Sequence, residues 1–312
     1  MKPVAMLAIL LAASLVTAQS QAPAQSAQPQ NAANAPAGKP PIRTKTNEEF
    51  RAYQLAIANA ADPVAMEKAA DDFAAKFPTS DARILLYRAA MSGYQEVGNP
   101  QKMMDMGMKV LAIDKDDPEA LIGVAELLEE RTTPTDLDRE QREAQVIDYA
   151  SHALKTIDTD LAVPAGTAPE KVEAYKKYLR STALAIVGTI YYKQENYQQA
   201  EGNLRNAIEA DLANPDPVVV LRLALALDQQ KKYGDALQQA NRAVELSKED
   251  TDLGRMARNE RDRLIVQTGG TPTPAATPAS PTPNAPPTAA PPTAAPPTAT
   301  QGAPAAAADP SH

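Results

Sequence analysis

The chain offers few side chains that could perform acid–base or metal chemistry. Its 312 residues include no cysteine and two histidines, His152 and His312. The lack of cysteine excludes disulfides, thiolate metal sites and cysteine nucleophiles, and two separate histidines leave little for zinc or proton transfer. No Gly-x-Ser-x-Gly elbow, phosphate loop or metalloprotease helix motif occurs. We therefore expect no catalytic residue, no cofactor and no metal, and predict that the protein is not an enzyme.

One acidic run has the beginning of a calcium-binding loop. Asp114, Asp116 and Asp117 are spaced like the first ligands of such a loop. However, Pro118 stands near the place of the sharp-turn glycine, and Ala125 replaces the bidentate glutamate. The run is better explained as a turn in which Asp117 caps the next helix.

A cluster of methionines allows two interpretations. Thioethers are ligands for copper(I), but methionine is also a pliable filler of irregular cores. We favour the core role for these four residues: Met103, Met104, Met106 and Met108.

Composition divides the chain into a core-forming middle and two polar flanks. All thirteen Phe and Tyr residues fall within residues 47–267. In residues 268–312, Pro, Ala and Thr supply 36 of 45 residues, and residues 19–46 are also poor in large apolar side chains. Such segments cannot bury enough apolar surface to fold. We predict a disordered linker at 19–46, one folded domain at 47–267 and a disordered, extended tail at 268–312.

The first eighteen residues have the pattern of an export signal. Met1 and Lys2 precede a run of thirteen residues (4–16) that is apolar except for Ser14, and small residues then offer a cleavage site before Gln19. Thirteen helical residues span about 20 Å, which is too short for the roughly 30 Å hydrocarbon core. The pattern predicts a signal peptide at 1–18, a periplasmic or secreted protein, and no integral membrane segment after cleavage. The alternative is an uncleaved membrane anchor.

The charge of the folded part limits the class of partner. Residues 47–267 hold 27 Lys and Arg against 38 Asp and Glu, a net charge of 27 − 38 = −11. A surface of this sign repels phosphate backbones. We therefore exclude nucleic acid and expect a protein or peptide partner.

Helix signals recur throughout the middle of the chain. Asp62, Asn99, Asp117 and Asp216 each precede a proline, the arrangement of an N-cap followed by proline at the first helical position. Residues 46–49 read Thr-Asn-Glu-Glu, a capping box. Apolar periodicity between such signals predicts helices near residues 47–60, 63–76, 81–97, 100–113, 118–130, 139–157, 169–195, 197–212, 217–231, 233–247 and 251–267. No strand-like alternation is present.

The helices near the end of the domain repeat with a period of 36 residues. Large apolar positions and two small positions are retained when 36 is added to Leu184, Val187, Gly188, Tyr191, Tyr197, Ala200, Leu204 and Ala207. Small residues on facing helices allow close approach, and we expect Gly188 to meet Ala200 within one antiparallel pair. Because one pair buries only part of its apolar face, such pairs must stack.

This pattern resembles the tetratricopeptide repeat (TPR) family. The same spacing occurs upstream at Tyr87, Ala90, Met91, Tyr94, Gly98, Met103, Gly107 and Val110. The resemblance covers roughly residues 47–247, with two strong and two or three degenerate repeats, and a generic helical bundle is the alternative. It implies an all-α, right-handed superhelical solenoid of antiparallel helix pairs, flanked by disordered termini.

The resemblance also implies a concave groove that binds an extended peptide or partner segment. The first helix of each pair has one face that carries the repeating apolar and small residues. The opposite face should line the groove, which predicts the following groove residues: Arg88, Ser92, Glu126, Thr189, Tyr192 and Arg222. The Lys and Asn clamp of chaperone-tail-binding members has no match on these helices. The expected function is a non-catalytic interaction scaffold of the cell envelope or secreted space. The alternative is a structural envelope or wall component, with the Pro-rich tail as tether and the repeats as spacer.

Overall fold

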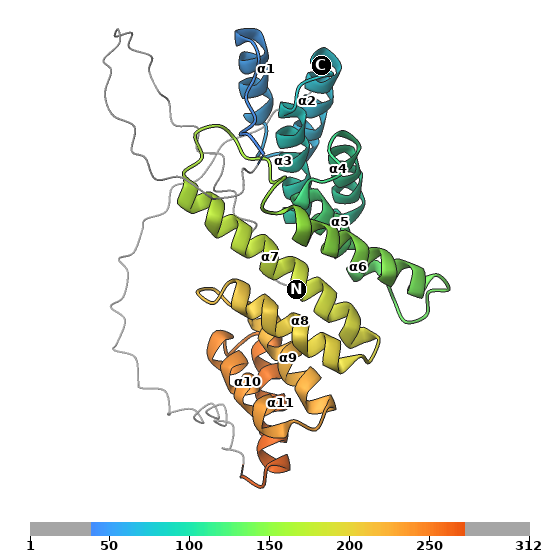
Figure 1. The fold of residues 1–312 in the computed structure, drawn as a ribbon, viewed down its shortest axis with the longest axis vertical. Coiled ribbons are helices and arrows are strands. Elements are labelled where there is room, and N and C mark those ends of the chain that lie inside the picture. Colours follow the sequence, from blue (N-terminus) through green and yellow to red (C-terminus); the bar gives the residue numbers. More distant parts are fainter. Residues whose placement is uncertain (1–38, 272–312) are drawn as a thin grey trace, which may run out of the picture. The chain divides into compact units, whose positions relative to one another are not determined.

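A computed structural model describes residues 39–271 (Figure 1). The signal peptide assigned to 1–18, most of the 19–46 linker and the tail from residue 272 onward lie outside the described residues. Eleven α-helices make up the described part: α1 (Asn47–Ile57), α2 (Pro63–Lys76), α3 (Ala82–Glu96), α4 (Pro100–Ile113), α5 (Pro118–Arg131), α6 (Arg139–Thr156), α7 (Pro169–Lys193), α8 (Tyr197–Ala210), α9 (Pro217–Gln229), α10 (Tyr233–Leu246) and α11 (Asp252–Gln267). All eleven expected helices are therefore present.

The predicted caps explain where these helices begin. A side-chain oxygen of Asp62, Asn99, Asp117 or Asp216 accepts a hydrogen bond from a first-turn amide of α2, α4, α5 or α9, at 2.8 to 3.3 Å. These bonds satisfy donors that have no partner inside the helix. The run that resembled a calcium loop is thus a turn in which Asp117 caps α5, as predicted.

Each helix packs against the next one along the chain, which is the arrangement of a solenoid of antiparallel pairs. Beyond nearest neighbours, contacts join α1 to α3, α5 to α7, α7 to α9 and α9 to α11. An ion pair between Arg88 and Glu119 joins α3 to α5. The odd-numbered helices therefore form one layer, which we call the odd-numbered layer, with the even-numbered helices behind it. The all-α solenoid of helix pairs expected from the sequence is confirmed.

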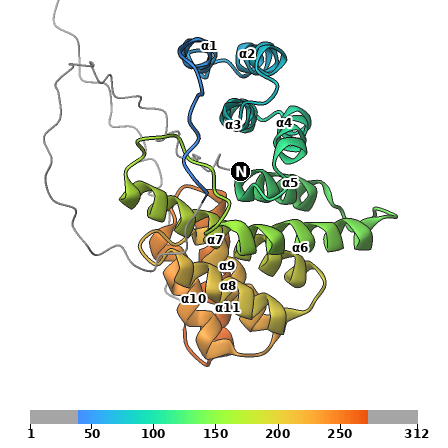
Figure 2. The same cartoon turned by 45° about the horizontal axis from the view of Figure 1, so that its top comes forward.

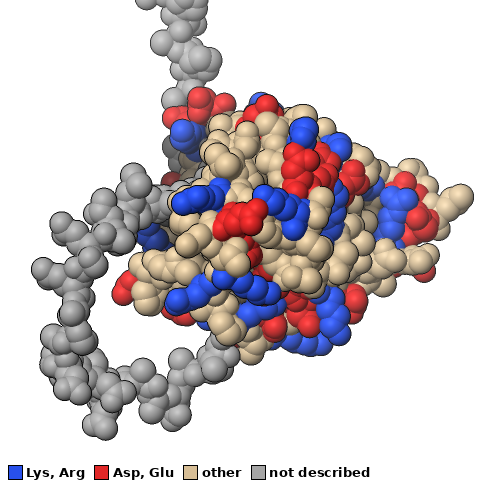
Figure 3. Space-filling view, turned by 90° about the horizontal axis from the view of Figure 1, so that it is seen from above, with Lys and Arg blue, Asp and Glu red and all other residues tan. Residues whose placement is uncertain are grey.

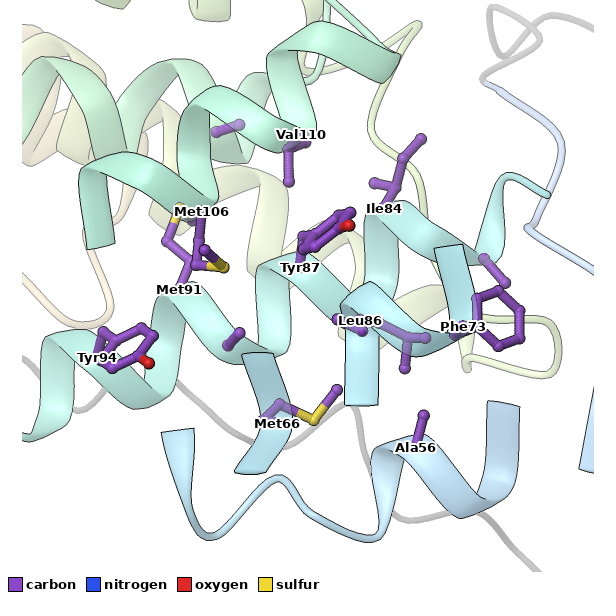
Figure 4. Close-up of a cluster of buried hydrophobic side chains, with 14 of the residues drawn as sticks. Ala56, Met66, Phe73, Ile84, Leu86, Tyr87, Met91, Tyr94, Met106 and Val110 are labelled. Carbon is purple, nitrogen blue, oxygen red and sulfur yellow. The ribbon is translucent and has the colours of Figure 1, made fainter. Parts of the chain in front are cut away.

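The core consists of three consecutive apolar clusters that share side chains at their borders. The first lies among α1 to α4 (Figure 4), where Met91 and Met106 lie side by side between α3 and α4. Leu111 packs on both the first and the second cluster, and Tyr191 packs on both the second and the third. Met103 and Met106 are buried, and Met104 is partly buried against the first cluster, so the core role predicted for the methionines holds for these three. Met108 is exposed, and for it the prediction is wrong.

The backbone repeats its conformation where three odd-numbered helices end. Gly98, Glu195 and Lys231 all have a left-handed backbone, with φ of 68°, 60° and 61°. The amide of the following residue donates to a carbonyl five residues earlier in each case, at 2.8 to 3.0 Å, which is the bond of a Schellman cap. Glu195 and Lys231 are 36 residues apart, so the period read from the side chains also holds for the backbone.

The close approach at Gly188 differs in its partner from the one predicted. A Cβ on Gly188 would lie 2.8 Å from Cγ of Leu204 and 3.2 Å from its amide nitrogen, so the nearest residue across the pair is Leu204, whereas the sequence predicted Ala200. A Cβ on Gly107 of α4 would lie 2.9 Å from Cγ2 of Val124 on α5 and 3.4 Å from Sδ of Met91 on α3. In each pair the two residues are 16 positions apart in the chain. The large residue is on the second helix in the pair Gly188 and Leu204, and on the first helix in the pair Met91 and Gly107. One small and one large side chain fill this contact in either order.

The structure corrects the predicted linker at its C-terminal end. Residues 39–46 lie against the fold, with Ile42 buried in the first cluster. The Ile42 amide donates to the carbonyl of Val163 at 3.0 Å, and Ile42 forms an isolated parallel bridge with Pro164. Near α1 the capping box forms, with Glu49 N donating to Thr46 Oγ1 at 3.1 Å and Lys45 N donating to Glu49 Oε2 at 2.6 Å. Nothing in the sequence indicated this packing, because Ile42 is the one large apolar residue of the predicted linker.

Candidate protein-binding face

The six residues predicted to line the groove all belong to the odd-numbered layer. Arg88 and Ser92 lie on α3, Glu126 on α5, and Thr189, Tyr192 and Arg222 on α7 and α9. Four of them are partly exposed: Ser92, Glu126, Tyr192 and Arg222. The sequence predicted that Arg88 and Thr189 would be available to a partner. Both are instead buried, at 5% and 4% exposure, so this prediction is wrong for these two residues.

Arg88 is the centre of a buried ionic cluster. Its guanidinium pairs with the Glu119 carboxylate and lies 3.8 Å from Asp117 Oδ2, and both acids are buried at the start of α5. Its Nη1 donates to the carbonyl oxygen of Ala162 at 2.6 Å. Burial raises the pKa of Asp117, and Arg88 opposes this rise. Burial likewise raises the pKa of Tyr175 on α7, which is next to the same cluster. This arginine therefore links α3, α5 and the chain that follows α6.

The segment that covers Arg88 is the connection between α6 and α7, residues 157–168, which we call the α6–α7 loop. Leu161, Ala162 and Val163 are buried, and Ala162 belongs to the first core cluster. The loop thus occupies the part of the odd-numbered layer around Arg88. Helical periodicity could not reveal this, because Ala162 lies 74 residues from Arg88 in the chain.

The exposed part of the layer lies on α7 and α9. Arg222 Nη1 donates to Thr189 Oγ1 at 2.7 Å, and Thr189 in turn donates to the Ala185 carbonyl at 2.7 Å. The Tyr192 ring packs edge-on against Tyr197, with ring centroids 5.6 Å apart. Within residues 39–271 the Arg222 guanidinium forms no ion pair, in contrast to Arg263 of α11, which pairs with Asp228 at 2.5 Å and Glu260 at 2.9 Å.

Glu126 on α5 is a second charged group without a partner of opposite sign. Burial, followed by the negative charges of Glu130, Glu129 and Asp216, raises the pKa of Glu126 to about 7. Burial, followed by the charge of Glu126, raises the pKa of Tyr178 on α7. Glu129 is neutralised by Lys193 at 2.6 Å, but no ion pair in the described part of the chain includes Glu126. A cationic group brought to this place would be stabilised by electrostatic attraction.

We expect Glu126 to make the stability depend on pH. Its folded pKa of about 7 exceeds the reference value of 4.5, so between these values the folded state binds more protons and stability falls as pH rises. The variant Glu126→Gln should be more stable than the wild type at pH 8 by about 1–3 kcal/mol, with no such gain at pH 4. Urea unfolding at the two pH values measures this, with exposed Glu140→Gln as control. An equal effect at both pH values would show that Glu126 is well solvated.

The other candidate groups from the sequence have structural roles. His152 Nε2 lies 2.8 Å from Asp116 Oδ1, which ties α6 to the turn before α5. Among residues 39–271, no three His, Cys, Asp or Glu side chains are placed to hold a metal ion.

Acidic and basic side chains alternate over the face shown in Figure 3. None of the described helices is both long and apolar enough to cross a membrane.

Comparisons with known proteins give distant structural matches. No family model and no curated protein matches the sequence. TTC0263, a thermophilic TPR protein in Thermus thermophilus, is 15% identical with a TM-score of 0.43, covering 68% of this chain and 98% of its own. A MamA protein is 12% identical with a TM-score of 0.44, covering 64% and 94%. A MamA RS-1 ArsTM double mutant is 17% identical with a TM-score of 0.41, covering 59% and 84%.

These TM-scores are below 0.5, so the description of the fold rests on the helix contacts, the recurring Schellman caps and the 16-residue packing pairs given above. On these grounds, the described residues form a solenoid of antiparallel helix pairs.

Proposed function

We propose that this protein is a non-catalytic interaction scaffold that binds an extended peptide segment of a partner protein across α5, α7 and α9. The observation that carries the proposal is a pair of partly buried, opposite charges in one helix layer. Glu126 and Arg222 flank α7, and neither forms an ion pair within residues 39–271. Partly buried charges are normally paired, and a partner with complementary charges would supply the missing ones.

The spacing of these charges indicates the kind of peptide. Asp216, at the start of α9, is one of the negative charges that act on Glu126, so we place the acidic end of the site near the start of α9. Arg222 lies six residues further along α9, a rise of roughly 9 Å. An extended chain covers that length in about three residues. The peptide that fits best has a basic and an acidic residue about three positions apart, with Tyr192 as an aromatic contact next to the peptide's acidic residue, which pairs with Arg222.

A library of labelled peptides tests this directly. Each peptide carries one lysine and one aspartate, in both orders, with the separation varied from one to six residues. We expect the tightest binding at a separation near three. Arg222→Gln retains a donor for Thr189 but removes the charge, and should weaken binding of the best peptide by about tenfold or more. Arg242→Gln on α10 is the matched control on an even-numbered helix. Equal binding at all separations, or an equal effect of both variants, would contradict the proposal.

The double variant Tyr192→Ala with Arg222→Glu tests the same face with natural partners. It should reduce partner capture, and lose about 1–2 kcal/mol of stability, because it removes both the contact of Tyr192 with Tyr197 and the bond from Arg222 to Thr189. Capture that persists in the double variant but is lost on deleting residues 272–312 would instead support a tail-tethered envelope component. The apolar run at residues 4–16 supports the periplasmic or secreted location that we propose.

A further inference from the structure

The end of the predicted linker is bound like a ligand. We call residues 39–45 the strap; it leaves the start of α1 and meets the α6–α7 loop (Figure 2). The Lys39 amide donates to the Thr159 carbonyl at 2.7 Å, and the Ile42 amide donates to the Val163 carbonyl at 3.0 Å. The Lys39 side chain pairs with Asp114, with exposures of 31% and 12% for the two side chains. Residues 39–42 of the strap are therefore held by one cation, one aliphatic side chain and two amides, and Lys45 adds a hydrogen bond from its Nζ to the Thr79 carbonyl at 3.1 Å.

The strap uses every amide that its central residues can offer. Pro40 and Pro41 have no N–H, so only residues 39 and 42 of this tetrapeptide can donate, and both do. The carbonyl groups of the loop thus recognise two donors three residues apart, with no requirement on the residues between them. Main-chain pairing of this kind binds extended segments of many sequences, and the flanking side chains add specificity.

We propose that Asp114 and residues 159–164 form a second peptide-binding site, for an extended segment of a partner protein with the pattern Lys-x-x-aliphatic, and that the strap occupies this site in competition with the partner. Apart from Ile42, the strap is exposed or partly exposed, so only a small area holds it in place. The conformational entropy lost on ordering the strap opposes these few contacts. This makes displacement by an equivalent segment feasible.

Charge complementarity defines which segments fit. Asp114 belongs to the acidic run that ends in the buried cap Asp117, and Lys39 supplies the opposite charge. Residues 268–312 are equally rich in proline but contain no Lys or Arg. A segment such as this tail therefore lacks the group that pairs with Asp114, and proline alone does not satisfy the site.

The test uses a fluorescent peptide of residues 37–44, AGKPPIRT, and the full-length chain. The variant Lys39→Glu with Ile42→Asp releases the strap. We expect the peptide to bind this variant at least about tenfold more tightly than the wild type, because the attached strap competes at an effective concentration in the millimolar range. Adding Asp114→Asn to the released variant should remove most of the gain. The control peptide of residues 285–295, APPTAAPPTAA, should not bind.

Two results would overturn the proposal. The first is equal, weak binding of the peptide to the wild type and to a released variant that retains its helical circular dichroism. The second is a wild-type dimer that disappears in the released variant, which would assign the site to the strap of a second copy. The Arg222→Gln variant should bind the strap peptide as the wild type does, so this test is independent of the face on α5, α7 and α9.

Discussion

Replacing Arg88 with leucine should lower the free energy of unfolding by about 3–5 kcal/mol at pH 7, because two buried carboxylates would lose their counter-charge. The carboxylates of Glu119 and Asp117 would stay buried without the positive charge that Arg88 supplies. The Ala162 carbonyl would lose its hydrogen-bond donor. The loss should be smaller at pH 4.5, since protonated carboxyl groups carry no charge that needs a partner. Urea unfolding of both proteins at the two pH values measures this difference.

Two further variants show whether the effect belongs to the ionic cluster. Arg51→Leu, at an exposed position of α1, should change stability by less than about 0.5 kcal/mol. Combining Arg88→Leu with Glu119→Leu should recover part of the loss, because it removes the carboxylate that lies closest to the guanidinium. If Arg88→Leu behaved like Arg51→Leu, Arg88 would be solvated, and the α6–α7 loop would not cover it in solution.

The second large effect is expected where α7 meets α8. Gly188→Met should cost about 1–3 kcal/mol, because even a Cβ at this position would lie 2.8 Å from Leu204. Leu204→Gly alone should cost roughly 2–5 kcal/mol through the cavity that it leaves. The double variant recreates the order found at Met91 and Gly107, with the large residue on the first helix. It should be more stable than the sum of the single effects implies, by at least about 1 kcal/mol.

A double-mutant cycle by chemical denaturation measures this coupling. The matched comparison is Gly202→Met with Leu204→Gly, since a Cβ on Gly202 would meet no atom within 4 Å. That combination should be additive to within about 0.5 kcal/mol. Additive energies for Gly188→Met with Leu204→Gly would mean that the two positions do not share one space, and that the 16-residue register is wrong.

Much of the fold was predictable because its signals are local. The Asx-Pro caps and the apolar period mark helix starts and faces within a few residues, and these determine the eleven helices. The pairing of helices followed from the 36-residue period. The nearest partner of Gly188 could not be predicted in the same way. The small residues at 188 and 200 suggested a contact, but which residues meet depends on the shift of one helix along the axis of the other.

The site was predicted less completely, since burial depends on distant segments. Periodicity placed Arg88 and Thr189 on the correct layer but could not show what covers them. The α6–α7 loop reaches Arg88 from 74 residues away, and Arg222 reaches Thr189 from the next odd-numbered helix, 33 residues on. Both contacts join polar groups, which leave no periodic trace in a sequence. The partly exposed members of the predicted set are Ser92, Glu126, Tyr192 and Arg222.

The central claim is that partners bind to the odd-numbered layer at α7 and α9. Site-specific photocrosslinking tests it most directly, with benzoylphenylalanine replacing Tyr192 in one protein and exposed Gln238 of α10 in another. In each case the full-length chain is irradiated with the best Lys/Asp peptide from the library. We expect an adduct from position 192, none from position 238, and loss of the adduct in the Arg222→Gln background. An adduct from position 238 alone would place binding on the opposite layer and contradict the account.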